Sequence, residues 1–78
     1  MKKVDKVWAY FALEEEGEGL CAFLDQKQKI WIPLICATET VAKRFEDMAQ
    51  NIANESGTKI QLAEFTVRTD IKIIEPEQ

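Results

Sequence analysis

The sequence predicts an α+β domain: an antiparallel sheet of four or five strands in the order β-β-β-α-β, with one helix packed on one face. Three observations carry this prediction. Two short segments rich in β-branched and aromatic residues flank a glutamate- and glycine-rich turn. A long segment with one apolar stripe follows, and a further β-prone segment ends the pattern. With 78 residues, 46% of them hydrophobic, residues 1–78 are predicted to form a single domain.

The first three strands are predicted at residues 4–13, 20–25 and 30–36. The acidic run at residues 14–18 and its two glycines separate the first strand from the second. A three-residue tip at residues 26–28 places Leu24 opposite Ile30 and Phe23 opposite Trp31, which sorts the hairpin into one aliphatic and one aromatic face. Since Pro33 cannot donate a ladder hydrogen bond, the third strand is predicted near an edge of the sheet.

The helix is predicted to begin after the N-cap Thr38 and to end near Glu55, with Gly57 as its stop. Its apolar residues repeat with the 3.6-residue period of one helix face. They are Val41, Ala42, Phe45, Met48, Ala49, Ile52 and Ala53. The helix is expected to cover the aliphatic sheet face, which includes Val7, Ala9, Phe11 and Leu13 of the first strand.

A last strand is predicted within residues 58–69. Ile60 and Leu62 occupy even positions and Phe65 and Val67 odd ones, so a bulge near Ala63 is expected. Residues 70–75 are predicted either to continue this strand or to form a fifth one.

The aromatic face is the predicted functional surface, and its residues are Trp8, Tyr10, Phe23 and Trp31. One helix covers only one side of a sheet, so the other side meets solvent or a partner. Tryptophan and tyrosine are the preferred anchors of protein interfaces. The sequence therefore predicts a protein–protein interaction or regulatory module that forms a homodimer or binds a protein partner. Two alternatives stay open: the two faces are interchanged, or the C-terminal segment folds over the aromatic residues.

A second candidate function is single-stranded nucleic-acid binding by base stacking on the aromatic face. Such modules add positive charge along the backbone path. Here the net charge is −4, and only Lys6, Lys27 and Lys29 lie near one edge of the predicted sheet. Nucleic acid is therefore the less favoured partner.

Little in the chain predicts catalysis. There is no histidine, and the two cysteines, Cys21 and Cys36, lack metal-ligand spacing. Both are expected to be buried, inert thiols, and the acidic run lacks the pattern of a calcium loop. No catalytic residue, metal site or cofactor is predicted, and an enzyme that uses either thiol ranks last. The N-terminal residues fit neither a signal peptide nor a membrane span, so a cytoplasmic location is expected.

The stretch Ile-Trp-Ile-Pro-Leu-Ile-Cys-Ala-Thr-Glu-Thr-Val-Ala-Lys-Arg-Phe, at residues 30–45, resembles a pattern in small uncharacterised bacterial domains, including the N-terminal part of SseB-like proteins. In those domains a strand that ends in a Pro-Leu or Pro-Val step leads into a helix that opens with Thr or Ser and then Glu. The resemblance extends over the first two thirds of the chain. It implies an accessory role and carries over no catalytic residue.

Overall fold

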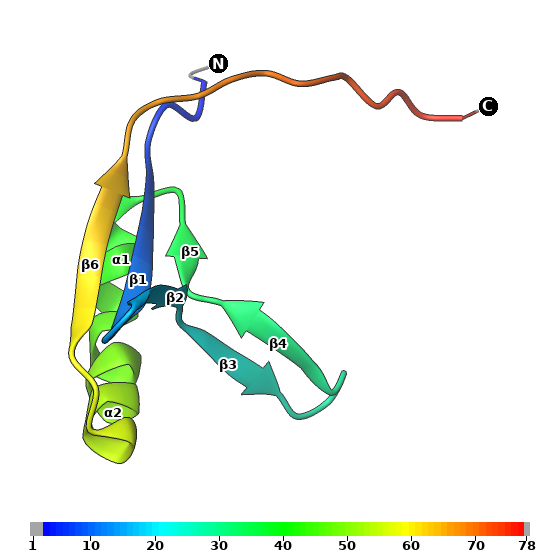
Figure 1. The fold of residues 1–78 in the computed structure, drawn as a ribbon. Coiled ribbons are helices and arrows are strands. Elements are labelled where there is room, and N and C mark those ends of the chain that lie inside the picture. Colours follow the sequence, from blue (N-terminus) through cyan, green and yellow to red (C-terminus); the bar gives the residue numbers. More distant parts are fainter. Residues whose placement is uncertain (1–2, 78) are drawn as a thin grey trace.

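One long strand organises the sheet. The computed structural model of the protein describes residues 3–77, and in it β1 (Val7–Glu14) pairs antiparallel with β2 (Gly17–Leu20), β5 (Ile35–Cys36) and β6 (Ile60–Phe65). Since β6 pairs with residues 7–12 of β1, both β2 and β5 lie along the opposite edge of β1 (Figure 1). This arrangement confirms the predicted α+β class with an antiparallel sheet.

A two-stranded hairpin projects away from this sheet and from the helix (Figure 1). It consists of β3 (Ala22–Asp25) and β4 (Ile30–Pro33) and is called the arm below. The predicted second and third strands are therefore each divided in two, at Cys21 and at Leu34. Three backbone hydrogen bonds join the arm to the sheet at this point: Cys21 N–H to Tyr10 O (2.9 Å), Leu34 N–H to Cys21 O (2.8 Å) and Tyr10 N–H to Leu34 O (3.1 Å).

The helix forms where its periodicity predicts it. Thr38 is the N-cap, and its Oγ1 accepts a hydrogen bond from the Val41 N–H at 3.2 Å. The helix consists of α1 (Glu39–Arg44) and α2 (Glu46–Ser56), which meet at Phe45. Gly57 ends it with φ of 69°, the left-handed conformation that glycine adopts without a Cβ clash. The predicted cap and stop residues are both confirmed.

The core lies between the helix and the Tyr10 side of the sheet. Its buried centre is Tyr10, Cys21, Leu34 and Ala49, and Leu34 is fully buried. Partly buried residues pack around it: Ala12, Phe23, Phe45, Met48, Ile52 and Ile60. The expectation that the helix covers the aliphatic face is therefore wrong, because Tyr10 and Phe23 face the helix and the Phe11 side of β1 does not.

The register of the arm explains part of the interchange between the predicted and the observed sheet faces. Asp25 pairs with Ile30 and Leu24 with Trp31, one residue away from the predicted register. The loop has four residues, 26–29, because Lys29 adopts φ of 58° and the Asp25 carboxylate accepts hydrogen bonds from the Lys27 and Gln28 N–H groups. A one-residue slip exchanges the faces of one strand relative to its partner. Ile32 and Leu34 therefore lie on the same side as Phe23 and Cys21.

The predicted bulge in the last strand is also wrong. β6 pairs with β1 without interruption, from Ile60 opposite Ala12 to Phe65 opposite Val7. Its apolar residues change parity because both faces of the strand are used. Ile60 packs against the core on the helix side, whereas the Phe65 ring lies 5.9 Å from the Phe11 ring on the other side.

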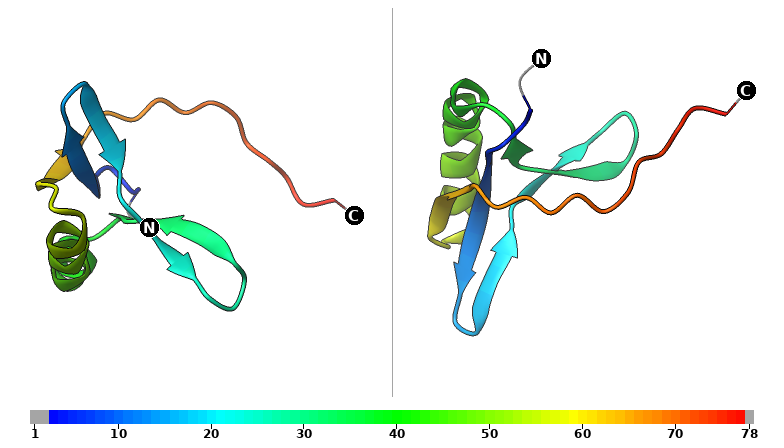
Figure 2. Two further views of the ribbon diagram at one scale, coloured as in Figure 1. Left: turned by 60° about the horizontal axis from the view of Figure 1, so that its bottom comes forward. Right: turned by 90° about the horizontal axis from the view of Figure 1, so that it is seen from above.

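Residues 66–77 form neither a continuation of β6 nor a fifth strand, and they are called the tail below. The tail runs away from the sheet in extended conformation (Figure 2). The radius of gyration is 15.0 Å, whereas a compact chain of this length is expected at roughly 11–12 Å. The tail and the arm account for this expansion.

Candidate interaction surface

The sheet has one face that the helix does not cover, and we call it the open face. Directly paired residues share a face. Phe11 pairs with Leu20, Ala9 with Ile35 and Val7 with Phe65, so these residues lie together on the side away from Tyr10. The open face is largely apolar and consists of Val7, Ala9, Phe11, Leu13, Leu20, Ile35, Ala63 and Phe65. The same pairings add two polar residues, Gln61 opposite Phe11 and Glu18 opposite Leu13.

Four large side chains of the open face are substantially exposed. Leu13 is 37%, Leu20 44%, Ile35 44% and Phe65 46% exposed. Isolated apolar residues on a surface are ordinary, whereas a contiguous group on one sheet face is typical of a contact surface. Leu13 and Leu20 were predicted to lie under the helix, whereas no face was predicted for Ile35 and Phe65. Their apolar character was visible in the sequence, but their exposure was not.

The arm extends the same side of the sheet. Alternation along the β4–β5 chain places Trp31, Pro33 and Ile35 on one side and the buried Leu34 on the other. Trp31 is 68% exposed, the largest exposure of any aromatic residue in the chain's described part. An exposed tryptophan on a projecting hairpin is well suited to insert into a pocket of another protein.

The four predicted aromatic residues do not lie together on one exposed surface. Tyr10 is buried in the core and Phe23 packs against it. Trp8 is half-buried on the helix side of β1, where it pairs with Cys36 and Glu64. Only Trp31 is largely exposed.

Tyr10 has a structural role in this arrangement. Its hydroxyl donates a hydrogen bond to the Ala42 carbonyl oxygen at 2.5 Å, which ties β1 to the helix. Burial raises the pKa of Tyr10 above its ordinary value, and the negative charge of Glu46, together with that of Cys36 where its thiol is ionised, raises it further. The phenol therefore stays protonated and keeps donating this hydrogen bond at neutral pH.

The described residues offer little chemistry for a reaction. Cys21 and Cys36 are free and buried, and burial raises the pKa of both thiols, which disfavours the nucleophilic thiolate. Within residues 3–77, no three His, Cys, Asp or Glu side chains are grouped to hold a metal ion, and no charged side chain is buried. The acidic run lies in and around the tight turn between β1 and β2, where its carboxylates are exposed.

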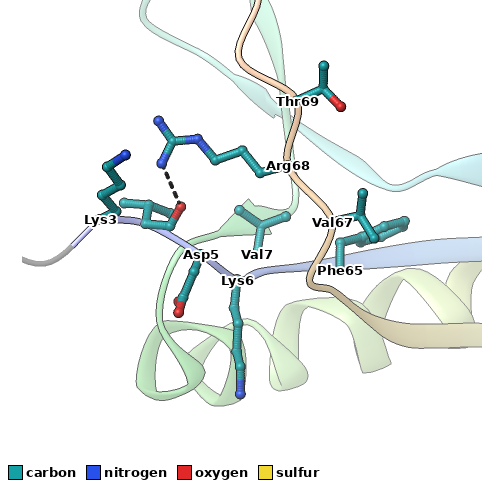
Figure 3. A pocket seen from close by; sticks show the side chains of 9 residues that line it. Lys3, Asp5, Lys6, Val7, Phe65, Val67, Arg68 and Thr69 are labelled. Atoms are coloured by element: carbon teal, nitrogen blue, oxygen red, sulfur yellow. Dashed lines mark hydrogen bonds between the residues drawn. The ribbon is translucent and has the colours of Figure 1, made fainter.

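Two hollows lie at the margins of the sheet. One, of about 650 Å³, lies between α2 and β6 and is lined by Ala49, Ala53, Ile60 and Leu62 among others. The other, of about 640 Å³, lies between residues 3–7 and the start of the tail (Figure 3). There Arg68 bridges the two segments, since its guanidinium donates to the Val4 carbonyl oxygen at 3.1 Å.

No protein-family model, curated protein or solved structure matches the chain. Neither helix in the described part of the chain has the length and apolar character needed to cross a membrane. The interpretation of the surface therefore depends on its own geometry.

Proposed function

We propose that this protein is a non-enzymatic interaction module that self-associates and uses its open face to contact protein. One observation carries the proposal: the single helix covers the Tyr10 side of the sheet, and a largely apolar side is left without cover. Domains of this size have small cores, with net stabilities of roughly 3–5 kcal/mol, and commonly gain stability by association.

The exposed residues support protein rather than nucleic acid as the partner. Leu20, Ile35 and Phe65 are suited to apolar contact with another folded surface. Of the four aromatic residues that could have formed a stacking platform, Tyr10 and Phe23 are engaged in the core. The positive charges of Lys27 and Lys29 lie in the loop at the tip of the arm and not along a groove.

The cytoplasm is the compartment that we propose for this function. Both cysteines are free, and free buried thiols are typical of proteins from reducing compartments. The resemblance to the N-terminal part of SseB-like proteins agrees with an accessory role, and we retain it as part of the proposal.

Light scattering over a concentration series tests the proposed self-association directly. We expect the mass to rise from one chain to two as the concentration increases. A mass of one chain at every concentration up to the millimolar range would refute it.

Nucleic-acid binding is tested by fluorescence anisotropy with a labelled single strand at several salt concentrations. We expect no specific binding. Salt-sensitive binding that is lost in Lys27→Glu and Lys29→Glu would instead support the nucleic-acid function.

A further inference from the structure

The outer edge of β6 is an unpaired strand edge. The Leu13 N–H donates to the Lys59 carbonyl oxygen at 2.9 Å, so odd-numbered residues of this segment direct their backbone groups toward β1. Leu62 and Glu64 therefore direct theirs away from β1. No other described strand pairs with that edge. Free edges of this kind are ready acceptors of another strand.

The tail is the chain's own β-prone segment without a partner. Val67, Ile71, Ile73 and Ile74 are between 82% and 91% exposed. Within the described residues, no backbone hydrogen bond involves the tail. The segment is already extended, but beyond the end of β6 it turns toward the side of the arm, so this turn must straighten for the tail to continue β6 as a strand (Figures 1 and 2).

We propose that the protein dimerises through these two features: β6 and the tail of one copy pair antiparallel with the tail and β6 of a second copy. A two-fold axis pairs both free edges and both tails in one dimer, because each copy supplies one free edge and one free strand. This inference rests on the proposed self-association and names its route.

Backbone direction restricts the register. Even-numbered residues of β6 face outward, so they must oppose even-numbered residues of the second copy for their hydrogen bonds to form. Among these registers, the one centred on Arg68 gives the best side-chain complementarity. It places Glu64 opposite Lys72 of the second copy.

The same register covers the exposed apolar residues of β6. Phe65, 46% exposed, lies opposite Ile71 of the second copy, and Leu62, also 46% exposed, lies opposite Ile74 of the second copy. A shift by two residues in one direction would oppose Glu64 to Asp70, two like charges. A shift in the other direction would oppose it to Ile74, so the second copy would add no charge partner to the ion pair that Glu64 forms with Lys6 of its own copy at 3.6 Å.

The two Arg68 residues at the axis do not prevent this pairing. Each guanidinium already forms an ion pair within its own copy, from Nε to the Asp70 carboxylate at 2.6 Å. It is also held by the Val4 carbonyl oxygen, as Figure 3 shows. The positive charge at the axis is therefore compensated by Asp70 of the same copy.

Strand pairing of this kind keeps both open faces on the same side of one continuous sheet. Odd-numbered residues oppose odd-numbered residues, so Phe65 and Ile71 of the second copy join the same surface. Dimerisation then doubles the open face and does not bury it. The surface that we assign to protein contact is larger in the dimer.

A charge exchange tests the register in the full chain. One directly opposed charge pair changes the dimer dissociation constant by a few fold. The two-fold axis generates two copies of the pair in each dimer, so the effect occurs twice. We expect Lys72→Glu to raise the dimer dissociation constant roughly tenfold, and Glu64→Lys with Lys72→Glu to restore it. The matched control is Ile35→Glu, which changes the open face away from the seam and is expected to leave the dissociation constant unchanged.

A crosslink gives an independent readout. In this register positions 65 and 71 form a non-hydrogen-bonded pair with Cα atoms about 4.5 Å apart, within the range that a disulfide spans. The double variant Phe65→Cys with Ile71→Cys should form a covalent dimer on mild oxidation. Phe65→Cys with Ile74→Cys, whose second position lies on the other face, should not.

The outcomes separate this inference from the proposed function. Loss of the dimer in Ile35→Glu together with an unchanged dimer in Lys72→Glu would overturn edge pairing and leave self-association through the open face. Equal crosslinking in both cysteine pairs would also overturn the register. A wild-type chain that is monomeric at every concentration would refute the self-association itself.

Discussion

Replacement of Leu34 by alanine tests how the arm and the core depend on each other. Leu34 is fully buried, and its backbone bonds to both Tyr10 and Cys21. The substitution removes three carbon atoms, about 2.4 kcal/mol at roughly 0.8 kcal/mol for each buried methylene. The cavity left behind adds to this cost, so a total loss of about 2–5 kcal/mol is expected.

That loss is large for a chain of this size. If the net stability is roughly 3–5 kcal/mol, Leu34→Ala removes about 40% of it or more. With a urea m-value near 1 kcal/mol/M, the unfolding midpoint should fall by at least about 2 M, as measured by far-UV circular dichroism. Val67→Ala is the matched control, since Val67 is 91% exposed and its truncation should change stability by less than about 0.5 kcal/mol. A loss below about 1 kcal/mol for Leu34→Ala would refute the placement of this side chain at the core.

Three further predictions concern the helix and its contact with β1. Gly57→Ala should destabilise the protein by about 1 kcal/mol because φ is 69° there, whereas Gly19→Ala, at a position without positive φ, should change stability little; thermal melts of both variants compare the two. Thr38→Ala should cost about 1 kcal/mol in urea unfolding by loss of the N-cap hydrogen bond, and a wild-type midpoint would contradict that role. The folded-state pKa of Tyr10 is raised, so its contribution to stability is fully present below the unfolded pKa near 10 and is lost as pH rises through the folded pKa. Tyr10→Phe should therefore lower stability by about 0.5–1.5 kcal/mol at pH 7 and flatten its decline in a series from pH 8 to 11.

The helix was predictable because its signals are local. A cap at Thr38, a stop at Gly57 and a 3.6-residue stripe each depend only on neighbouring residues. The class of the fold followed from the same kind of signal. Local patterns also identified the two β-prone segments before the helix, although not the bends at Cys21 and Leu34.

The assignment of faces failed because it depended on one loop. The four-residue loop depends on the positive φ of Lys29 and on the hydrogen bonds that Asp25 accepts from the loop, and the neighbouring sequence does not indicate that positive φ. Since both faces of β1 are apolar, the hydrophobic pattern could not correct the error.

The sequence therefore predicted that an apolar sheet face is exposed, but it did not predict which residues form that face. As predicted, the one helix leaves one largely apolar face of the sheet uncovered. Of the four residues named for that surface, however, Trp31 alone is largely exposed. Residues 70–75 were predicted to continue the last strand or to form a fifth one, but among the described residues no neighbouring strand pairs with them.

The attachment of the arm allows its length to change without a change in the core. It joins the rest of the chain through hydrogen bonds at Tyr10, Cys21 and Leu34, and Trp31 lies beyond that junction. Insertion of two residues into each arm strand would preserve the alternation of side chains and displace the loop by roughly 7 Å, without altering any core position. The reach of the tryptophan can thus be tuned by hairpin length alone, while the junction stays constant.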